Sequence, residues 1–148
     1  MLTRRHILSG LALAPVLGTP AFAREPAFYQ ENGVAIDGSD PVAYFDMNGP
    51  VAGSTAHTLT WRGVEWRFAS AENMTKFEAN PDGFAPQFGG YCAWAVSQGY
   101  TASTTPEAWT IHEGKLYLNF SKRIQRRWER DIPGNVARGE ANWPSVLG

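Results

Sequence analysis

The residue whose side chain is best suited to a chemical role is Cys92, the only cysteine in a chain of 148 residues. It lies in the stretch FGGYCAWAVSQG, directly after two glycines and flanked by the aromatic residues Tyr91 and Trp94. A helix that begins here would place free backbone N–H groups near the sulfur, and such groups favour the thiolate. Tyr91 and Trp94 could wall a pocket and donate a hydrogen bond. On this interpretation Cys92 is reactive or binds a ligand, and Tyr91 and Trp94 are its candidate catalytic neighbours.

A buried and inert Cys92 is the competing interpretation, because free cysteine is among the most buried residue types. A single cysteine excludes an internal disulfide and a redox centre of the C-x-x-C type. A cycle through a sulfenic acid would need an external resolving thiol, and a cysteine hydrolase would need an oriented base. Two functions are compatible with these limits: thiol redox chemistry with an outside partner, and the binding of a small ligand. The residues therefore fit an enzyme and a binding protein equally.

A copper or zinc site is an alternative of a different class. Beyond the N-terminal segment the chain has two histidines, His57 and His112, both in expected strands. A thiolate from Cys92 with imidazoles would suit either metal, and Met47 or Met74 could add a soft ligand. The spacing of these residues is not diagnostic, and two exposed strand histidines explain the sequence as well.

The N-terminus has the pattern of an export signal. The sequence MLTRRHILSG supplies two adjacent arginines, an apolar segment follows, and the small residues of TPAFA form an A-x-A cleavage site. Residues 1–23 are therefore expected to be a signal peptide, cut between Ala23 and Arg24. The pattern T-R-R-H-I-L resembles a twin-arginine signal, although an ordinary secretory signal could also carry an arginine pair. Either route predicts a periplasmic protein.

Length and composition predict one domain over residues 24–148. This part has 11 basic and 14 acidic residues, a net charge of −3, which disfavours nucleic-acid binding. It has no second apolar segment and no lipidation cysteine after the signal, so no stable membrane anchor is expected. The full chain has nineteen aromatic residues, which can supply a core without disulfides. The expected partners are a small molecule, a metal ion or another periplasmic protein, and in the last case the chain would act only as a protein-interaction module.

Local patterns predict an α+β fold with a small antiparallel sheet of hairpins and short helices. Polar and apolar residues alternate around the turns Arg62-Gly63 and Glu113-Gly114, as in β-hairpins. Serines before apolar-spaced segments predict helix starts. The expected elements are hairpins over 57–68 and 109–120, a helix after Ser70 that ends at NPDG, a short helix over 91–98 and a helix from Ser121 through residue 131.

Three other segments have simpler expectations. Residues 24–39 are expected to form an N-terminal arm, and Asp40 to cap the short turn that follows it. Pro133 and Gly134 are expected to end the last helix and leave only a turn before Pro144. The basic run KRIQRRWER is expected to be a solvated helix face with Glu–Arg pairs, or a surface for an anionic partner.

Three segments of the chain resemble exported YHS-domain proteins. They are GSDPVAYF, WRGVEWRFASAENMTKFEANPDGFAPQFGGYCAWAVSQG and LYLNFSKRIQRRWERDIPGNVARGEANWP. The resemblance covers residues 33–146. The resemblance is to the branch known as YHS-domain (seleno)proteins, in which some members have selenocysteine at the position of Cys92. It implies a YHS-type single domain and favours a reactive or ligand-binding Cys92.

The resemblance does not extend to the metal ligands of YHS domains. Metal-binding members have cysteines in D-P-V-C and F-C-S-x-x-C, and the matching positions here are Ala43, Ala69 and Asn73. An alanine offers no ligand to a soft metal. The resemblance therefore implies a retained scaffold without the original ligand set.

Overall fold

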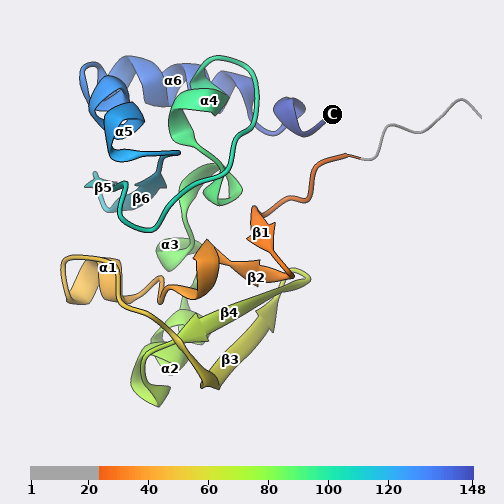
Figure 1. The fold of residues 1–148 in the computed structure, drawn as a ribbon, viewed down its shortest axis with the longest axis vertical. Coiled ribbons are helices and arrows are strands. Elements are labelled where there is room, and N and C mark those ends of the chain that lie inside the picture. The colour runs from red at the N-terminus through yellow and green to blue at the C-terminus, as the bar shows by residue number, and fades with distance from the viewer. Residues whose placement is uncertain (1–23) are drawn as a thin grey trace, which may run out of the picture.

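Two β-sheets and the helices beside them make up the described part of the chain, residues 24–148, in this computed structural model (Figure 1). The expected signal peptide, residues 1–23, lies outside the described residues. The fold is α+β, as the sequence predicts. Within residues 24–148 no helix has the length and apolar character needed to cross a membrane.

The larger sheet has four strands in the order β1-β2-β4-β3. The first expected hairpin forms β3 and β4, paired antiparallel. The expected N-terminal arm contributes the other two strands, and β2 pairs with β4 in parallel, so the sheet is mixed rather than antiparallel. Strands β1 and β2 have only two residues each, which is too short for an alternation of polar and apolar residues to be recognised in the sequence. The strands are β1 (Gln30–Glu31), β2 (Val34–Ala35), β3 (Ser54–Trp61) and β4 (Val64–Phe68).

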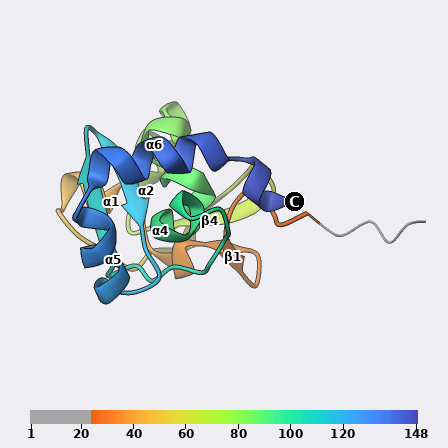
Figure 2. The same ribbon diagram turned by 90° about the horizontal axis from the view of Figure 1, so that it is seen from above.

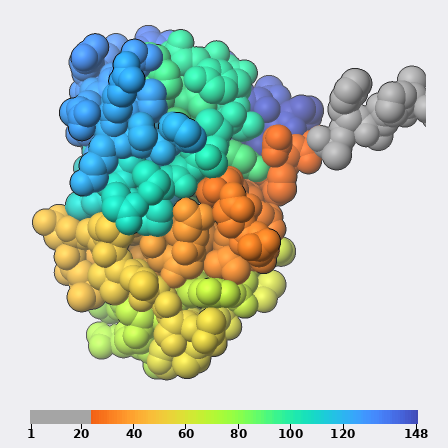
Figure 3. All heavy atoms as spheres, in the orientation of Figure 1, coloured from red at the N-terminus to blue at the C-terminus, as the bar shows by residue number. Residues whose placement is uncertain are grey.

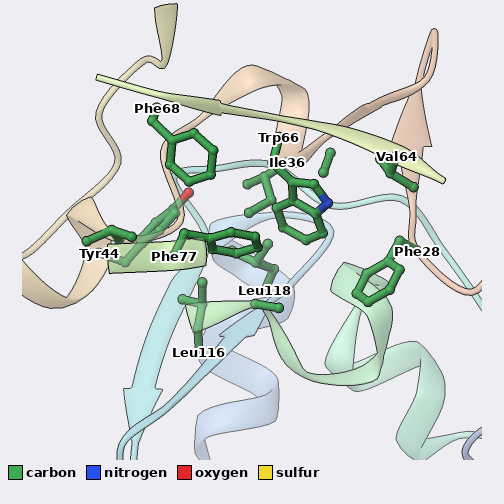
Figure 4. Packing of buried hydrophobic residues seen from close by; sticks show 12 residues of the cluster. Phe28, Ile36, Tyr44, Val64, Trp66, Phe68, Phe77, Leu116 and Leu118 are labelled. Atoms are coloured by element: carbon green, nitrogen blue, oxygen red, sulfur yellow. The ribbon is translucent and has the colours of Figure 1, made fainter. Parts of the chain in front are cut away.

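Alternation along β4 builds the first hydrophobic core. Trp66 and Phe68 point inward and are at most 1% exposed, while Glu65 and Arg67 form an ion pair on the other face at 2.8 Å. Phe77, on helix α2 (Ala71–Ala79), packs between the inward rings at centroid distances of 5.1 Å (Figure 4). The expected N-cap is confirmed, because a serine side chain accepts a hydrogen bond at the start of α2. We call this the sheet half of the molecule.

A buried carboxylate anchors the sheet half. Asp40 is 0% exposed and accepts four hydrogen bonds, from the backbone N–H groups of Val42, Ala43 and Ala69 and from the Asn73 side chain. These donors come from the start of α1 (Ala43–Asp46), the residue after β4, and α2. The expected capping role of Asp40 is confirmed, and the same carboxylate also joins three elements that are distant in sequence.

The second core lies among helices in the C-terminal part of the chain, which we call the helical half. Tyr117 and Trp128 stack at a centroid distance of 5.0 Å within it, and α6 packs across α4 (Figure 2). In the space-filling view the two halves form the upper and lower parts of one body (Figure 3). The helices are α3 (Pro81–Phe84), which links the halves, α4 (Ala93–Ser97), α5 (Lys122–Glu129) and α6 (Ile132–Asn142).

Helix α6 corrects the sequence interpretation. The expected turn after Pro133 and Gly134 is an eleven-residue helix, capped by Asp131, whose carboxylate accepts a hydrogen bond from the Gly134 N–H at 3.1 Å. Proline is tolerated in the first turn of a helix, where its missing N–H needs no partner. The proline therefore begins a second helix instead of only ending the first.

The second expected hairpin, β5 (Trp109–His112) and β6 (Lys115–Leu118), is confirmed and joins the two halves. Leu116 and Leu118 belong to the core of the sheet half, while Tyr117 belongs to that of the helical half. Because β6 is buried on both faces, its C-terminal end emerges between the two cores. The residues that follow β6 are therefore held from both sides.

Candidate functional site

The turn before Cys92 has an unusual backbone. Phe88, Gly89 and Gly90 are all left-handed, with φ of 55°, 63° and 80°. A side chain on Gly89 would clash with the carbonyl oxygen of Ala27, so this position requires glycine. The expected tight turn is confirmed, and it places Cys92 immediately before the first residue of α4.

Cys92 is enclosed by hydrogen bonds. Its backbone N–H donates to the Ala102 carbonyl at 3.0 Å. Its sulfur accepts a hydrogen bond from the Phe120 N–H at 3.3 Å, and its S–H donates to Oδ1 of Asn119 at 3.5 Å. The residue is only 1% exposed. These contacts hold the thiol in one orientation between α4 and the segment after β6.

Asn119 positions this thiol, and sequence reasoning gave it no role. Its side chain is 0% exposed, and Oδ1 also accepts a hydrogen bond from the Trp94 N–H at 3.0 Å. Its backbone bonds to Thr105 and Ala108 fix it in place. Nδ2 has no hydrogen-bond partner among residues 24–148. The sequence does offer one signal for such a role: Asn119 is the only side-chain amide in the segment LYLNF, among aliphatic and aromatic residues.

Burial raises the pKa of the Cys92 thiol, and backbone N–H groups of Ala95, Phe120 and Trp94 offset this only in part. The thiol is therefore protonated at neutral pH. The sequence had favoured a thiolate, on the argument that a helix begins at this point. That expectation is wrong because removal of the sulfur from water outweighs the nearby amides.

A surface pocket of about 200 Å³ adjoins the thiol. Two aromatic side chains in its lining are largely exposed, Tyr100 at 51% and Phe120 at 55%. Cys92 is almost fully buried, yet it is one of the residues that line this pocket. The lining residues are Cys92, Trp94, Ala95, Tyr100, Ala102, Phe120 and Ile124; we call this the Cys92 pocket.

The two aromatic residues that the sequence paired with Cys92 have different positions. Trp94 lines the pocket, and the guanidinium of Arg127 lies 5.6 Å from the centre of its ring. Tyr91 is outside the lining. Its hydroxyl donates to the Pro26 carbonyl at 2.7 Å, and its ring contacts that of Trp143. Tyr91 therefore holds the N-terminal segment and does not contribute to the pocket.

The candidate metal ligands are not gathered at the thiol. His112 lines a separate hollow, with Nε2 3.9 Å from the Glu113 carboxylate. His57 lies on β3 in the other half of the molecule, Met47 is 60% exposed, and Met74 packs against the first core. Among residues 24–148, no group of three or more His, Cys, Asp or Glu side chains is arranged to hold a metal ion.

The positions that match the YHS metal cysteines do come together. Ala43, Ala69 and Asn73 each donate a hydrogen bond to Asp40, two through the backbone and one through the side-chain amide. One carboxylate with four hydrogen bonds thus contacts all three of the positions that the sequence resemblance aligns with YHS metal cysteines. Comparison of the chain with family models, with curated proteins and with solved structures found no match.

Proposed function

We propose that this chain is an exported YHS-type protein, sent to the periplasm by the twin-arginine route, that binds a small molecule in the Cys92 pocket. The observation that carries the proposal is the apolar pocket itself, with a fixed thiol in its wall and exposed aromatic rings at its edge. The YHS assignment is supported by the sequence segments and by the grouping of Ala43, Ala69 and Asn73 around one carboxylate.

The lining defines the kind of ligand. Ligand pockets are typically apolar with a few placed polar groups, and the Cys92 pocket has this composition. Its volume is below the roughly 300–1,000 Å³ of sites for drug-sized molecules, so its ligand is small. Exposed rings such as those of Tyr100 and Phe120 lose water contact when a ligand covers them, which favours binding.

The thiol would serve as a soft, neutral contact to this ligand. Thiol redox chemistry is the second candidate, because the Phe120 N–H donates a hydrogen bond to the sulfur and would stabilise the thiolate, the form that a peroxide oxidises to a sulfenic acid. The raised pKa favours ligand binding over redox chemistry, since the thiolate is the reactive form. The donor set gives no comparable support to a copper or zinc carrier.

The proposal can be tested by comparing two thiol reagents of the same chemistry. We expect uncharged N-ethylmaleimide to modify native Cys92 at least about tenfold faster than a trimethylammonium maleimide, after both rates are normalised to those with glutathione, because an apolar pocket excludes a charge. Mass spectrometry of the intact protein measures both rates. Equal normalised rates would show that the thiol is reached by unfolding rather than through the pocket.

A matched pair of variants locates the route to the thiol. Ala102→Leu adds volume to the pocket lining and should slow N-ethylmaleimide, whereas Ala71→Leu makes the same change on the exposed start of α2 and should not. If Ala102→Leu leaves the rate unchanged while the protein stays folded, the pocket is not the route. Sulfenic acid formed by mild peroxide at a rate above that of glutathione would favour the redox candidate instead.

A further inference from the structure

Helix α5, next to the Cys92 pocket, carries an unbalanced positive charge. Four of its eight residues are basic and exposed: Lys122, Arg123, Arg126 and Arg127. None of the four forms an ion pair within 4.0 Å among residues 24–148. The Glu–Arg pairing expected for this helix is therefore not found, and α5 lies on the surface of the helical half (Figure 3).

The spacing of these charges opposes helix stability. Lys122 and Arg126 are four residues apart, as are Arg123 and Arg127, so each pair brings like charges together on one side of the helix. Such pairs destabilise a helix, and an acidic residue at either position would remove the repulsion. A local arrangement that opposes the fold is typical of a functional surface.

One of these charges lies at the edge of the pocket. Ile124 lines the pocket, and Arg127 follows it by three residues, so both project from the same side of α5. The Arg127 guanidinium is 5.6 Å from the ring centre of Trp94, which is also part of the lining. The aromatic contact holds the guanidinium beside the pocket and leaves its N–H donors without a carboxylate partner among the described residues.

We infer that the ligand of the Cys92 pocket is a small amphiphilic anion: an apolar, ring-sized body with a carboxylate or similar oxyanion. The body occupies the space between Trp94, Phe120 and Ile124, and the anionic group meets Arg127 at the edge. A guanidinium binds oxyanions through paired, charge-assisted hydrogen bonds. Because residues 24–148 carry a net charge of −3, the surface of α5 is what makes the binding of an anion favourable. This inference rests on the proposed function and defines its ligand class.

The test uses two ligands that differ only in charge, indole-3-acetate and the neutral indole-3-acetamide. Isothermal titration calorimetry of the folded protein in low salt should give an affinity for the acid about five- to tenfold higher than for the amide. Arg127→Gln should reduce this ratio to near one. Arg126→Gln removes the same charge from the same helix away from the lining and should largely preserve the ratio.

The possible results separate the inference from the proposed function. Equal affinities for acid and amide in the wild type, with no effect of Arg127→Gln, would overturn the anion inference and leave pocket binding intact. Binding of neither ligand at millimolar concentration would contradict the proposed function. Acid binding that is unchanged in Ala102→Leu would place the anion on α5 outside the pocket and overturn the inference. The inference is supported if the ratio of acid to amide affinity falls in Arg127→Gln and in high salt, and if Ala102→Leu binds neither ligand.

Discussion

The two halves of the molecule each have a buried polar centre, and the two centres are built differently. In the sheet half, the Asp40 carboxylate receives four hydrogen bonds. In the helical half, the Cys92 thiol and the Trp94 N–H share one acceptor, Oδ1 of Asn119, and Asn119 Nδ2 has no partner among residues 24–148. A fully bonded buried centre stabilises the packing around it, whereas a buried polar atom without a partner lowers the stability of the fold.

The surface charges show the same contrast. In the sheet half, Glu65 pairs with Arg67 and Asp46 with Lys76, each at 2.8 Å. In the helical half, the four basic residues of α5 repel one another and form no ion pair within the described chain. Under the proposed function, the sheet half provides stability and the helical half carries the candidate site. The following predictions test that division.

The largest expected effect is at the carboxylate of the sheet half. Asp40→Ala leaves three backbone N–H groups and the Asn73 amide buried without an acceptor, so it should lower the free energy of unfolding by about 4 kcal/mol. Urea denaturation followed by tryptophan fluorescence measures the change. Asp46→Ala, which removes an exposed carboxylate paired with Lys76, should cost less than about 1 kcal/mol. Similar losses in the two variants would contradict the anchoring role of Asp40.

A smaller effect is expected at the polar centre of the helical half. Asn119→Ala removes the acceptor for the Trp94 N–H and the Cys92 thiol, and it also removes an amide that had no partner. The two changes partly cancel, so we expect a loss of about 2 kcal/mol. Because the thiol is no longer held, N-ethylmaleimide should also react faster with Cys92 in this variant while the protein remains folded. A loss as large as that of Asp40→Ala would remove the contrast between the two centres.

The pH dependence of stability isolates the thiol. Because burial raises the pKa of Cys92 in the folded state above its ordinary value of 9.0, the unfolded chain loses this proton first as the pH rises. The stability of the wild type relative to Cys92→Ala should therefore be constant at neutral pH and fall as the pH rises above about 8.5. Buried tyrosines titrate in both proteins, so the difference between the two urea curves reports Cys92 alone. If the wild type instead became more stable relative to Cys92→Ala as the pH rises, the thiol would be ionised in the folded state.

The smallest effect tests the contrast in surface charge. Lys76→Met in the sheet half should lower the free energy of unfolding slightly, because it breaks contacts to Asp46 and Glu72. Arg126→Gln on α5 should leave it unchanged or raise it by about 0.3 kcal/mol, because it relieves repulsion from Lys122. Paired urea curves in low salt resolve the sign. A destabilising Arg126→Gln would show that α5 has stabilising charge contacts after all.

The sequence was most informative where a pattern is local. Alternation around Arg62-Gly63 and Glu113-Gly114 predicted both hairpins, and serine caps predicted the starts of α2 and α5. The parallel pairing of β2 with β4 was not predictable, because it joins two-residue strands to a distant segment. Helix α6 was missed because a proline was taken as the end of a helix when it lies in the first turn of the next.

At the candidate site, the sequence identified the Cys92 thiol and its glycine turn but not the environment of the thiol. Cys92 and Trp94 were predicted together and both line the pocket, whereas Tyr91 faces the N-terminal segment. Asn119 reaches the thiol only through the tertiary packing of β6 between two cores, 27 residues along the chain. The sign of the thiol pKa shift depends on burial, which short-range patterns do not determine.

The most direct test of the central claim is the detection of a neutral ligand inside the Cys92 pocket by NMR. With indole in excess over ¹³C-labelled protein, we predict intermolecular NOEs from the indole ring to the methyl groups of Ala102 and Ile124 and to the β protons of Cys92. Saturable binding with NOEs at these three residues would place the ligand against the thiol. NOEs only to residues outside the lining, or none at saturating indole, would contradict the account.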